Sequence, residues 1–379
     1  MSNVVRVPIT NVFMGGDYTG RILVGPNKTP LNVILDTGSS ALAVDAKKYS
    51  PDPTGGDQST DLAQTDSYGD GSTWTGAVIH TTISMGEGAS SVVLPGGNLA
   101  VAYSASADMF QSADGILGLA YAALDDAFTM PGDTWKNQYT STQVRSGKGG
   151  DLVPYLTQLT NAGVPSDIIS FLTRRSFIHA GGGDANDPLN QGWMIVGGGV
   201  ESTDLYTGSF QTVKVVSDAW YSTNMKAVIM GSTDPNAARL EGPKGMPSNS
   251  IVDSGTNSLN IGSQMLNAIV SKFSASQQAL LNRAIPNGAL VSTADLNLGD
   301  WPNLTFVLEG DAGDVSLTVA PSDYWQVDTQ QVGAAAIALT EGEAGFAILG
   351  LPLMNGYFTI FDGEADGGRG AIRFATKKG

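Results

Sequence analysis

Short apolar runs closed by turn-forming residues recur along the whole chain. These runs are rich in Val, Ile, Thr and aromatic side chains, and a Gly, Pro or Asn bounds them on at least one side. Such a pattern is typical of β-strands joined by tight turns. Clear examples are residues 20–25, 31–35 and 91–94. We therefore expect a mainly β protein.

Helical periodicity is confined to two places. Residues 152–162 carry apolar side chains on one helical face, and residues 264–273 do the same after Ser263, which we expect to cap that helix. Residues 125–150 are polar and Gly-rich and show no period. This composition predicts an exposed loop.

The most informative feature is a pair of motifs that occurs twice. The first copy is Val33-Ile-Leu-Asp-Thr-Gly-Ser39, followed later by Asp114-Gly-Ile-Leu-Gly-Leu119. The second copy is Ser250-Ile-Val-Asp-Ser-Gly-Thr256, followed later by Phe346-Ala-Ile-Leu-Gly-Leu351. Because the order repeats at a similar spacing, the sequence indicates two homologous lobes.

We place the N-terminal lobe at residues 1–200 and the C-terminal lobe at residues 201–379, so that each contains one copy of the motif pair. The boundary lies near an apolar run that ends in glycines, residues 193–199. A chain of 379 residues is long enough to bury two separate cores. Asp36 then belongs to the first lobe and Asp253 to the second.

Composition agrees with a strand-rich fold and argues against several functions. Charged residues are 15% of the chain, against about 25% in typical domains. The formal net charge of −16 opposes binding to nucleic acid or anionic lipid. The chain has no cysteine and two histidines, so we expect no disulfide, no metal and no cofactor.

The N-terminus lacks the charged start and the apolar run of a signal peptide. No apolar stretch approaches the roughly 20 residues that a membrane helix requires. We therefore expect a cytoplasmic protein that does not enter a membrane and that acts as a monomer.

Each repeated Asp stands at the end of an apolar strand and is followed by Ser or Thr and then Gly. The glycine lets backbone amides approach the carboxylate closely. If a pseudo-twofold axis relates the lobes, Asp36 and Asp253 would hold one water, share one proton and titrate as a pair. One carboxylate would deprotonate the water while the other protonates a substrate carbonyl.

Along nearly its whole length the chain resembles the pepsin-like aspartic proteases. Besides the repeated motifs, the resemblance includes the flap-like segment Ser67-Tyr-Gly-Asp-Gly-Ser-Thr73 and Tyr206-Thr-Gly-Ser209. It implies the bilobal pepsin-like acid protease fold, with two related β-barrel-like lobes and a cleft between them. It also implies an aspartic endopeptidase that acts on peptide or protein substrates at acidic pH and is sensitive to pepstatin-like inhibitors.

The resemblance also assigns roles to single residues. Thr37 and Ser254 would brace the lobes, and the flap residue Tyr68 would close over the substrate. Asp70 matches an acidic flap position of fungal members that accept Lys before the cleaved bond, which predicts tolerance of a basic residue there. The assigned residues are the catalytic Asp36 and Asp253; the supporting Thr37, Gly38, Ser39, Ser254, Gly255 and Thr256; and the substrate-side Tyr68, Gly69, Asp70 and Trp220.

Three departures from the family pattern limit what carries over. Family members usually hold the flap tyrosine with a Trp indole where this chain has Ala43; Trp74 on the flap could replace it, although we expect Trp74 to pack. Leu351 stands where pepsins have Asp, so the pH optimum need not copy theirs. The absence of cysteine and of room for a propeptide resembles the bacterial, intracellular members.

Two alternatives stay open. A pepsin-fold protein without proteolysis could act as a binding or inhibitor protein, and loss of a catalytic Asp would mark it. An actin-like kinase or ATPase also uses two strand-end Asp loops, there to bind phosphates and a metal. That fold needs several long helices, which this acidic, strand-rich chain hardly offers.

Overall fold

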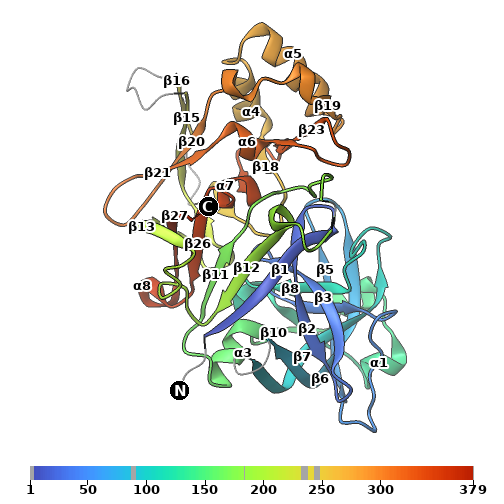
Figure 1. Cartoon of the computed structure of the whole chain (residues 1–379). Coiled ribbons are helices and arrows are strands. Elements are labelled where there is room, and N and C mark those ends of the chain that lie inside the picture. Colours follow the sequence, from blue (N-terminus) through green and yellow to red (C-terminus); the bar gives the residue numbers. More distant parts are fainter. Residues whose placement is uncertain (1–3, 87–90, 183, 232–237, 243–247, 379) are drawn as a thin grey trace. The chain divides into compact units, whose positions relative to one another are not determined.

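The computed structural model shows a protein of strands (Figure 1). It describes residues 4–86, 91–182, 184–231, 238–242 and 248–378. Strands far exceed helices in these ranges, so the mainly β prediction is confirmed. No helix within them is both long and apolar enough to span a bilayer.

The chain forms two compact units, and several segments cross from one to the other. The first unit comprises residues 1–9, 19–169 and 194–198, and the second comprises residues 10–18, 170–193 and 199–379. The lobe limits at 1–200 and 201–379 stay a prediction.

The first unit is a sheet whose strands come mostly from the N-terminal third of the chain. Its strands are β1 (Val5–Met14), β2 (Asp17–Val24), β3 (Thr29–Asp36), β4 (Leu42–Asp45), β5 (Gln58–Ser67), β6 (Thr73–Met85), β7 (Val92–Ala105), β8 (Gly115–Gly118), β9 (Asp126–Thr129) and β10 (Lys148–Asp151). Strands β1, β2, β11 (Ile168–Leu172) and β12 (Gln191–Val196) contribute residues to both units.

Six strands of the first unit close a barrel. Their order is β2-β3-β8-β4-β7-β6, and β6 pairs again with β2 through Ile22↔Met85 and its neighbours. Apolar side chains of these strands, such as Val33, Leu35 and Leu117, are fully buried. Asp36 is the last residue of β3, so the packed barrel wall positions it.

The predicted loop at 125–150 is wrong. The segment follows η2 (Ala122–Leu124) and holds β9, α1 (Thr134–Asn137), α2 (Ser141–Arg145) and the start of β10. These elements are too short to show a period: strand pairing, such as Leu62↔Thr129 between β5 and β9, and a capping box at Thr140 and Gln143 hold them instead. Ala63, Met130 and Val144 form a small buried cluster between this segment and β5.

The two predicted helices exist with shifted ends. Helix α3 spans Tyr155–Asn161 rather than 152–162, because Pro154 is its N-cap and the residues before a proline avoid the helical conformation. Helix α4 spans Ser263–Val270 rather than 264–273. Gly262, in an extended conformation, is the N-cap, so the expected cap at Ser263 is wrong: Ser263 is the first helical residue.

The second unit contains three smaller sheets, strands β26, β27 and β13 of the large sheet, and most of the described helices. Its strands are β13 (Tyr206–Lys214), β14 (Ser222–Thr223), β15 (Met225–Met230), β16 (Ala238–Glu241), β17 (Ser250–Val252), β18 (Leu259–Gly262), β19 (Val291–Ser292), β20 (Leu304–Leu308), β21 (Val315–Val319), β22 (Trp325–Val327), β23 (Ala334–Ile337), β24 (Leu339–Gly342), β25 (Ala347–Leu349), β26 (Tyr357–Asp362) and β27 (Ala371–Lys377). Its other helices are η3 (Pro188–Asn190), α5 (Ala275–Ala284), η4 (Thr293–Asp295), η5 (Leu298–Asp300), α6 (Pro321–Tyr324), α7 (Leu351–Met354) and α8 (Ala365–Gly368).

Aromatic side chains fill the core of the second unit. Tyr221 packs edge-on against Phe361, with ring centroids 4.7 Å apart, and Trp301 packs in the same way against Trp325 at 5.3 Å. Helix α5, with 10 residues, is the longest within the described ranges. The actin-like alternative, which needs several long helices, is therefore not favoured.

Candidate active site

Asp36 is placed by a parallel strand pair in the first unit. Strand β3 runs alongside β8, in the register Val33↔Gly115 to Asp36↔Gly118. Strand β4 follows the Asp36 loop and pairs antiparallel with the other side of β8. The repeated Ile-Leu-Gly motif is therefore the strand that supports the Asp loop from beneath.

The carboxylate of Asp36 is held by donors of its own loop. The Gly38 amide donates to Oδ1 at 2.8 Å, and the Ser39 hydroxyl donates to Oδ2. Asp36 is 5% exposed. Donors on both oxygens fix the orientation of a nearly buried acid that would otherwise be costly to place there.

Asp253 has the same surroundings in the second unit. The Gly255 amide donates to its Oδ1 at 2.9 Å, and the Thr256 hydroxyl donates to its Oδ2 at 2.6 Å. Asp253 is 6% exposed and directly follows β17. The two acidic groups thus have equal burial and matching donors.

The strands around the two loops correspond one by one. In the first unit the order is β7-β4-β8-β3, and in the second it is β24-β18-β25-β17. In both, the strand that leads into the Asp pairs parallel with the Ile-Leu strand, and the strand that leaves the loop pairs antiparallel with it. The motif repeat in the sequence is therefore a repeat of structure.

The last position of each Ile-Leu-Gly element requires glycine for steric reasons. A Cβ on Gly118 would lie 2.4 Å from backbone atoms of Ser40, and a Cβ on Gly350 would lie 2.2 Å from the Thr256 carbonyl oxygen. Both contacts are far below van der Waals distance. Each Asp loop therefore packs directly on a residue that has no side chain.

The predicted flap is a hairpin formed by β5 and β6. The Tyr68 amide donates to the Ser72 carbonyl and the Gly71 amide donates to the Tyr68 carbonyl, both at 2.9 Å. Gly71 has a φ of +85°, which favours glycine. Gly69 and Asp70 are exposed at the tip, and Asp70 Oδ1 accepts from the Ser72 amide at 2.8 Å.

Tyr68 is held by Trp74 from within the same hairpin. Trp74 is 1% exposed, and its indole Nε1 donates to the Tyr68 hydroxyl at 3.1 Å. The packing role that we expected for Trp74 is present together with a hydrogen bond. Burial, followed by the negative charges of Asp66 and Asp36, raises the pKa of Tyr68 well above its ordinary value, so Tyr68 keeps its proton.

The remaining predicted residues lie close to the Asp loops. Thr37 and Ser254, which follow the two acids, are buried. Trp220 is 39% exposed, and the carbonyl of the next residue, Tyr221, accepts from the Val252 amide at 3.3 Å. Trp220 therefore stands beside the strand that leads into Asp253. The functional roles of all these residues stay predictions.

Sequence reasoning missed Gln64, Asp66 and Asp125, which lie near the flap. Gln64 Nε2 donates to Asp125 Oδ1 at 2.7 Å. Strand alternation was the available signal, because it places Gln64, Asp66 and Tyr68 on one face of β5 and its continuation. The expected loop at 125–150 hid the partner of Gln64.

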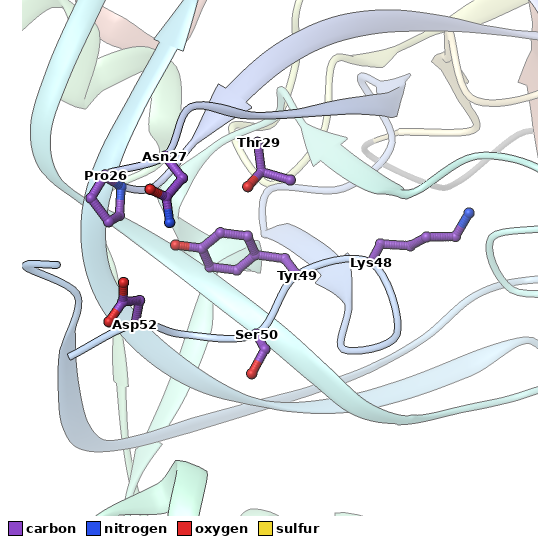
Figure 2. Close-up of a pocket in the computed structure, with 7 residues that line it drawn as sticks. All are labelled: Pro26, Asn27, Thr29, Lys48, Tyr49, Ser50 and Asp52. Carbon is purple, nitrogen blue, oxygen red and sulfur yellow. The ribbon is translucent and has the colours of Figure 1, made fainter. Parts of the chain in front are cut away.

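A small polar cavity of about 80 Å³ lies at the other end of β3 (Figure 2). Thr29, the first residue of β3, lines it, whereas Asp36 is the last residue of that strand. At roughly 3.3 Å per residue, about 23 Å of strand separate the two. The cavity therefore lies away from the Asp36 loop. The hydroxyl of Tyr49, which also lines it, donates to Asp57 at 2.5 Å.

Within the described residues, no three His, Asp or Glu side chains gather in a way that could hold a metal ion. The donors on the two Asp side chains are amides and hydroxyls.

Comparison with known proteins agrees with this geometry. A family model described as eukaryotic aspartyl protease matches residues 17–144 and 184–376. Pepsin II-2/3 of Oryctolagus cuniculus is 24% identical over 365 residues, which cover 92% of this chain and 79% of the relative.

Two further relatives have a similar sequence identity and coverage. Pepsin A of Sus scrofa is 24% identical over 370 residues, covering 94% of this chain and 80% of the relative. Rhizopuspepsin-2 of Rhizopus niveus is 24% identical over 372 residues, covering 94% and 79%. The family match extends over both Asp loops, the flap and both Ile-Leu-Gly strands. The chain therefore belongs to the eukaryotic aspartyl protease family and is an aspartic-type endopeptidase, a hydrolase.

Proposed function

We propose that Asp36 and Asp253 are the catalytic dyad of this endopeptidase and hydrolyse peptide bonds through one shared water. The observation that carries the proposal is the matched set of donors on the two carboxylates, a glycine amide on Oδ1 and a hydroxyl on Oδ2. The corresponding strand orders around the two loops support it. A structural Asp would not need this arrangement twice.

Two carboxylates on one water cannot both ionise comfortably, so the dyad would hold one proton over a wide pH range. The ionised carboxylate takes a proton from the water, which attacks the scissile carbonyl carbon. The protonated carboxyl gives its proton to the carbonyl oxygen as the water adds. When the C–N bond of the tetrahedral intermediate breaks, the carboxyl that took the water proton passes it to the amine nitrogen, and a hydroxyl of the intermediate returns its proton to the other carboxylate. Because this cycle needs one proton on the pair, we expect activity at acidic pH and inhibition by pepstatin.

The other residues orient and enclose the reaction. The Gly38 and Gly255 amides and the Ser39 and Thr256 hydroxyls would keep the dyad oxygens aligned. Tyr68, on the flap, would close over the peptide and exclude water. We propose the flap tip at Gly69 and Asp70, together with Trp220, as substrate contacts, and Thr37 and Ser254 as braces of the two loops. A monomeric, cytoplasmic enzyme of bacterial origin stays a prediction.

A pepsin-fold binding or inhibitor protein is the alternative that a cleavage assay excludes. Peptide cleavage would be measured from about pH 3 to 7, with and without pepstatin, on the wild type and on the Asp253→Asn variant. We expect acid-dependent cleavage that pepstatin blocks and that the variant lacks. Asp45→Asn is the matched control. Asp45 also ends a strand, β4, but its carboxylate accepts from the Lys47 amide and, within the described residues, from no recorded hydroxyl. Cleavage that survives both pepstatin and Asp253→Asn would refute the dyad.

A further inference from the structure

Asp66 is an acidic residue of the flap strand that the proposed mechanism does not use. It stands two residues before Tyr68, on the same face of the strand, and it is half-buried. The Ser67 amide donates to its Oδ1 at 2.7 Å. Its carboxyl group also hydrogen-bonds with the Tyr68 hydroxyl.

The Tyr68 hydroxyl has three polar neighbours and only one hydrogen. The neighbours are the Trp74 indole, the Asp66 carboxyl and the Ser39 hydroxyl. Trp74 is a donor only, so it occupies one lone pair of the Tyr68 oxygen. Tyr68 can then donate its single hydrogen to only one of the other two groups, Asp66 or Ser39.

While Asp66 is ionised, both Asp66 and Ser39 can only accept a hydrogen bond from Tyr68. Ser39 already gives its one hydrogen to Asp36 Oδ2, so its oxygen can receive a hydrogen from Tyr68 but cannot offer one. An ionised Asp66 has no hydrogen to offer either. Once Asp66 takes up a proton, its OH can donate to the second lone pair of Tyr68, and the Tyr68 hydrogen becomes free for Ser39.

We propose that Asp66 is a positioning residue that sets the direction of the Tyr68 hydrogen, and through it the hydrogen bonding of Asp36. With Asp66 ionised, Tyr68 donates to Asp66. With Asp66 protonated, the donors run in one direction, from Asp66 to Tyr68 to Ser39 to Asp36. Aligned hydrogen bonds strengthen each other, so the protonated form supports the Asp36 charge more strongly. The inference rests on the proposed role of Asp36 in catalysis.

The surroundings of Asp66 favour its protonated form. Burial raises its pKa, and the negative charge of Asp126 adds to this, whereas the Ser67 amide, the Arg145 charge and the Tyr68 hydroxyl oppose it. The charge of Asp66 in turn raises the pKa of Asp125. Since the pKa is raised, Asp66 holds its proton at pH values where an ordinary Asp has lost it. Residues 125–150 supply Arg145 and Asp126, whose charges shift the pH at which the Tyr68 hydrogen changes its acceptor.

The first test is the pH profile of kcat/KM for Asp66→Asn and Asp66→Ala. Asn keeps the Ser67 bond through Oδ1 and presents a permanent NH₂ donor to Tyr68, and Ala removes the competing acceptor. In both variants we expect the loss of activity toward neutral pH to move downward by about 0.5 pH unit or more, about threefold in kcat/KM on that limb, because stronger support of the Asp36 charge lowers the pH at which the pair gives up its shared proton. Asp61→Asn, an exposed carboxyl on the same strand, should leave the profile unchanged. Unshifted profiles in two active Asp66 variants would overturn the proposal.

The second test needs no activity and separates this inference from the proposed function. The indole N–H resonance of Trp74 reports on the Tyr68 oxygen that it contacts. In the wild type and in Asp61→Asn, this resonance should titrate above the ordinary Asp range near pH ~4. The step should vanish in Asp66→Asn. If the step persists there, Asp66 does not control Tyr68, whether or not the protein cleaves peptides.

Discussion

The indole nitrogen of Trp74 donates to the Tyr68 hydroxyl at 3.1 Å, across the turn of one hairpin. Strand β6 therefore fixes the flap tyrosine from within the flap itself, whereas Ala43, in β4, has no side-chain donor to offer. The tyrosine stays bonded to its partner when the hairpin moves as a unit.

Replacement of Trp74 by Phe should remove this restraint while the ring stays in the core. One hydrogen bond contributes about 0.5–1.5 kcal/mol, so kcat/KM should fall by about 3- to 10-fold. Trp135→Phe, in α1, is the matched control and should change little. Steady-state kinetics of both variants would decide, and an equal response of the two would show that Trp74 only packs.

Gly350→Ala should distort the Asp253 loop. The new Cβ would lie 2.2 Å from the Thr256 carbonyl oxygen and 2.5 Å from that of Ser258, so backbone must move. Overpacking of this kind costs about 1–3 kcal/mol, and we expect kcat to fall by at least about tenfold because Thr256 holds the carboxylate. At Gly150, where an added Cβ meets nothing within 4 Å, the same change should be silent in urea unfolding and in kinetics. A fully active Gly350→Ala enzyme would contradict this steric reading.

Asp125 should make the protein less stable as the pH rises toward neutral. Burial raises its pKa to about 7, against the opposing hydrogen bond from Gln64. Folding therefore takes up a proton, so the stabilising contribution is complete below about pH 4 and disappears as the pH rises through 7. Asp125→Asn keeps the acceptor for Gln64 and should be more stable than the wild type at pH 8 by about 2 kcal/mol, but not at pH 4.

Urea unfolding at the two pH values measures this difference. Asp108→Asn, an exposed carboxyl of the same unit, serves as the control and should follow the wild type. The same pH dependence in the wild type and in Asp125→Asn would show that Asp125 does not bind the proton.

Asp70 should allow a basic residue before the cleaved bond. Its Oδ1 is occupied by the Ser72 amide and hydroxyl, at 2.8 and 2.7 Å, and the other oxygen faces no recorded donor within the described residues. An exposed charge pair contributes up to about 1 kcal/mol, so Asp70→Thr should lower the ratio of kcat/KM for Lys over Leu substrates by about 3- to 5-fold. A cleavage map that does not change on this substitution would remove Asp70 from the specificity site.

Much of the site could be predicted because it is encoded locally. Asp36 and Asp253 end apolar strands, and the glycines after them allow short-range donors, so a few residues of sequence carry the geometry. The repeat predicted two related lobes, whereas the strand pairing around each Asp loop came only from the structure. The sequence left the Trp74–Tyr68 bond open beside a packing role, because periodicity does not give the rotamer of an indole.

The prediction of a loop at residues 125–150 was wrong for a different reason. Its elements are only four or five residues long and are held by caps and by pairing with β5, so no period exists to detect. Helix α5 did carry a local signal, the capping box of Ser274 and Gln277, but it has too few apolar residues on one face for its helical period to be recognised. Contacts between segments far apart in sequence decided both cases.

The most direct test of the dyad is a double-substitution cycle. Peptide cleavage at acidic pH would be measured for the wild type, Asp36→Asn, Asp253→Asn and the double variant. Residues that act as one unit are strongly non-additive, so each single change should lower kcat by about 10³-fold or more and the double change should lower it no further. Effects that multiply, or a single variant that keeps most of its activity, would show that the two carboxylates do not act on the same water.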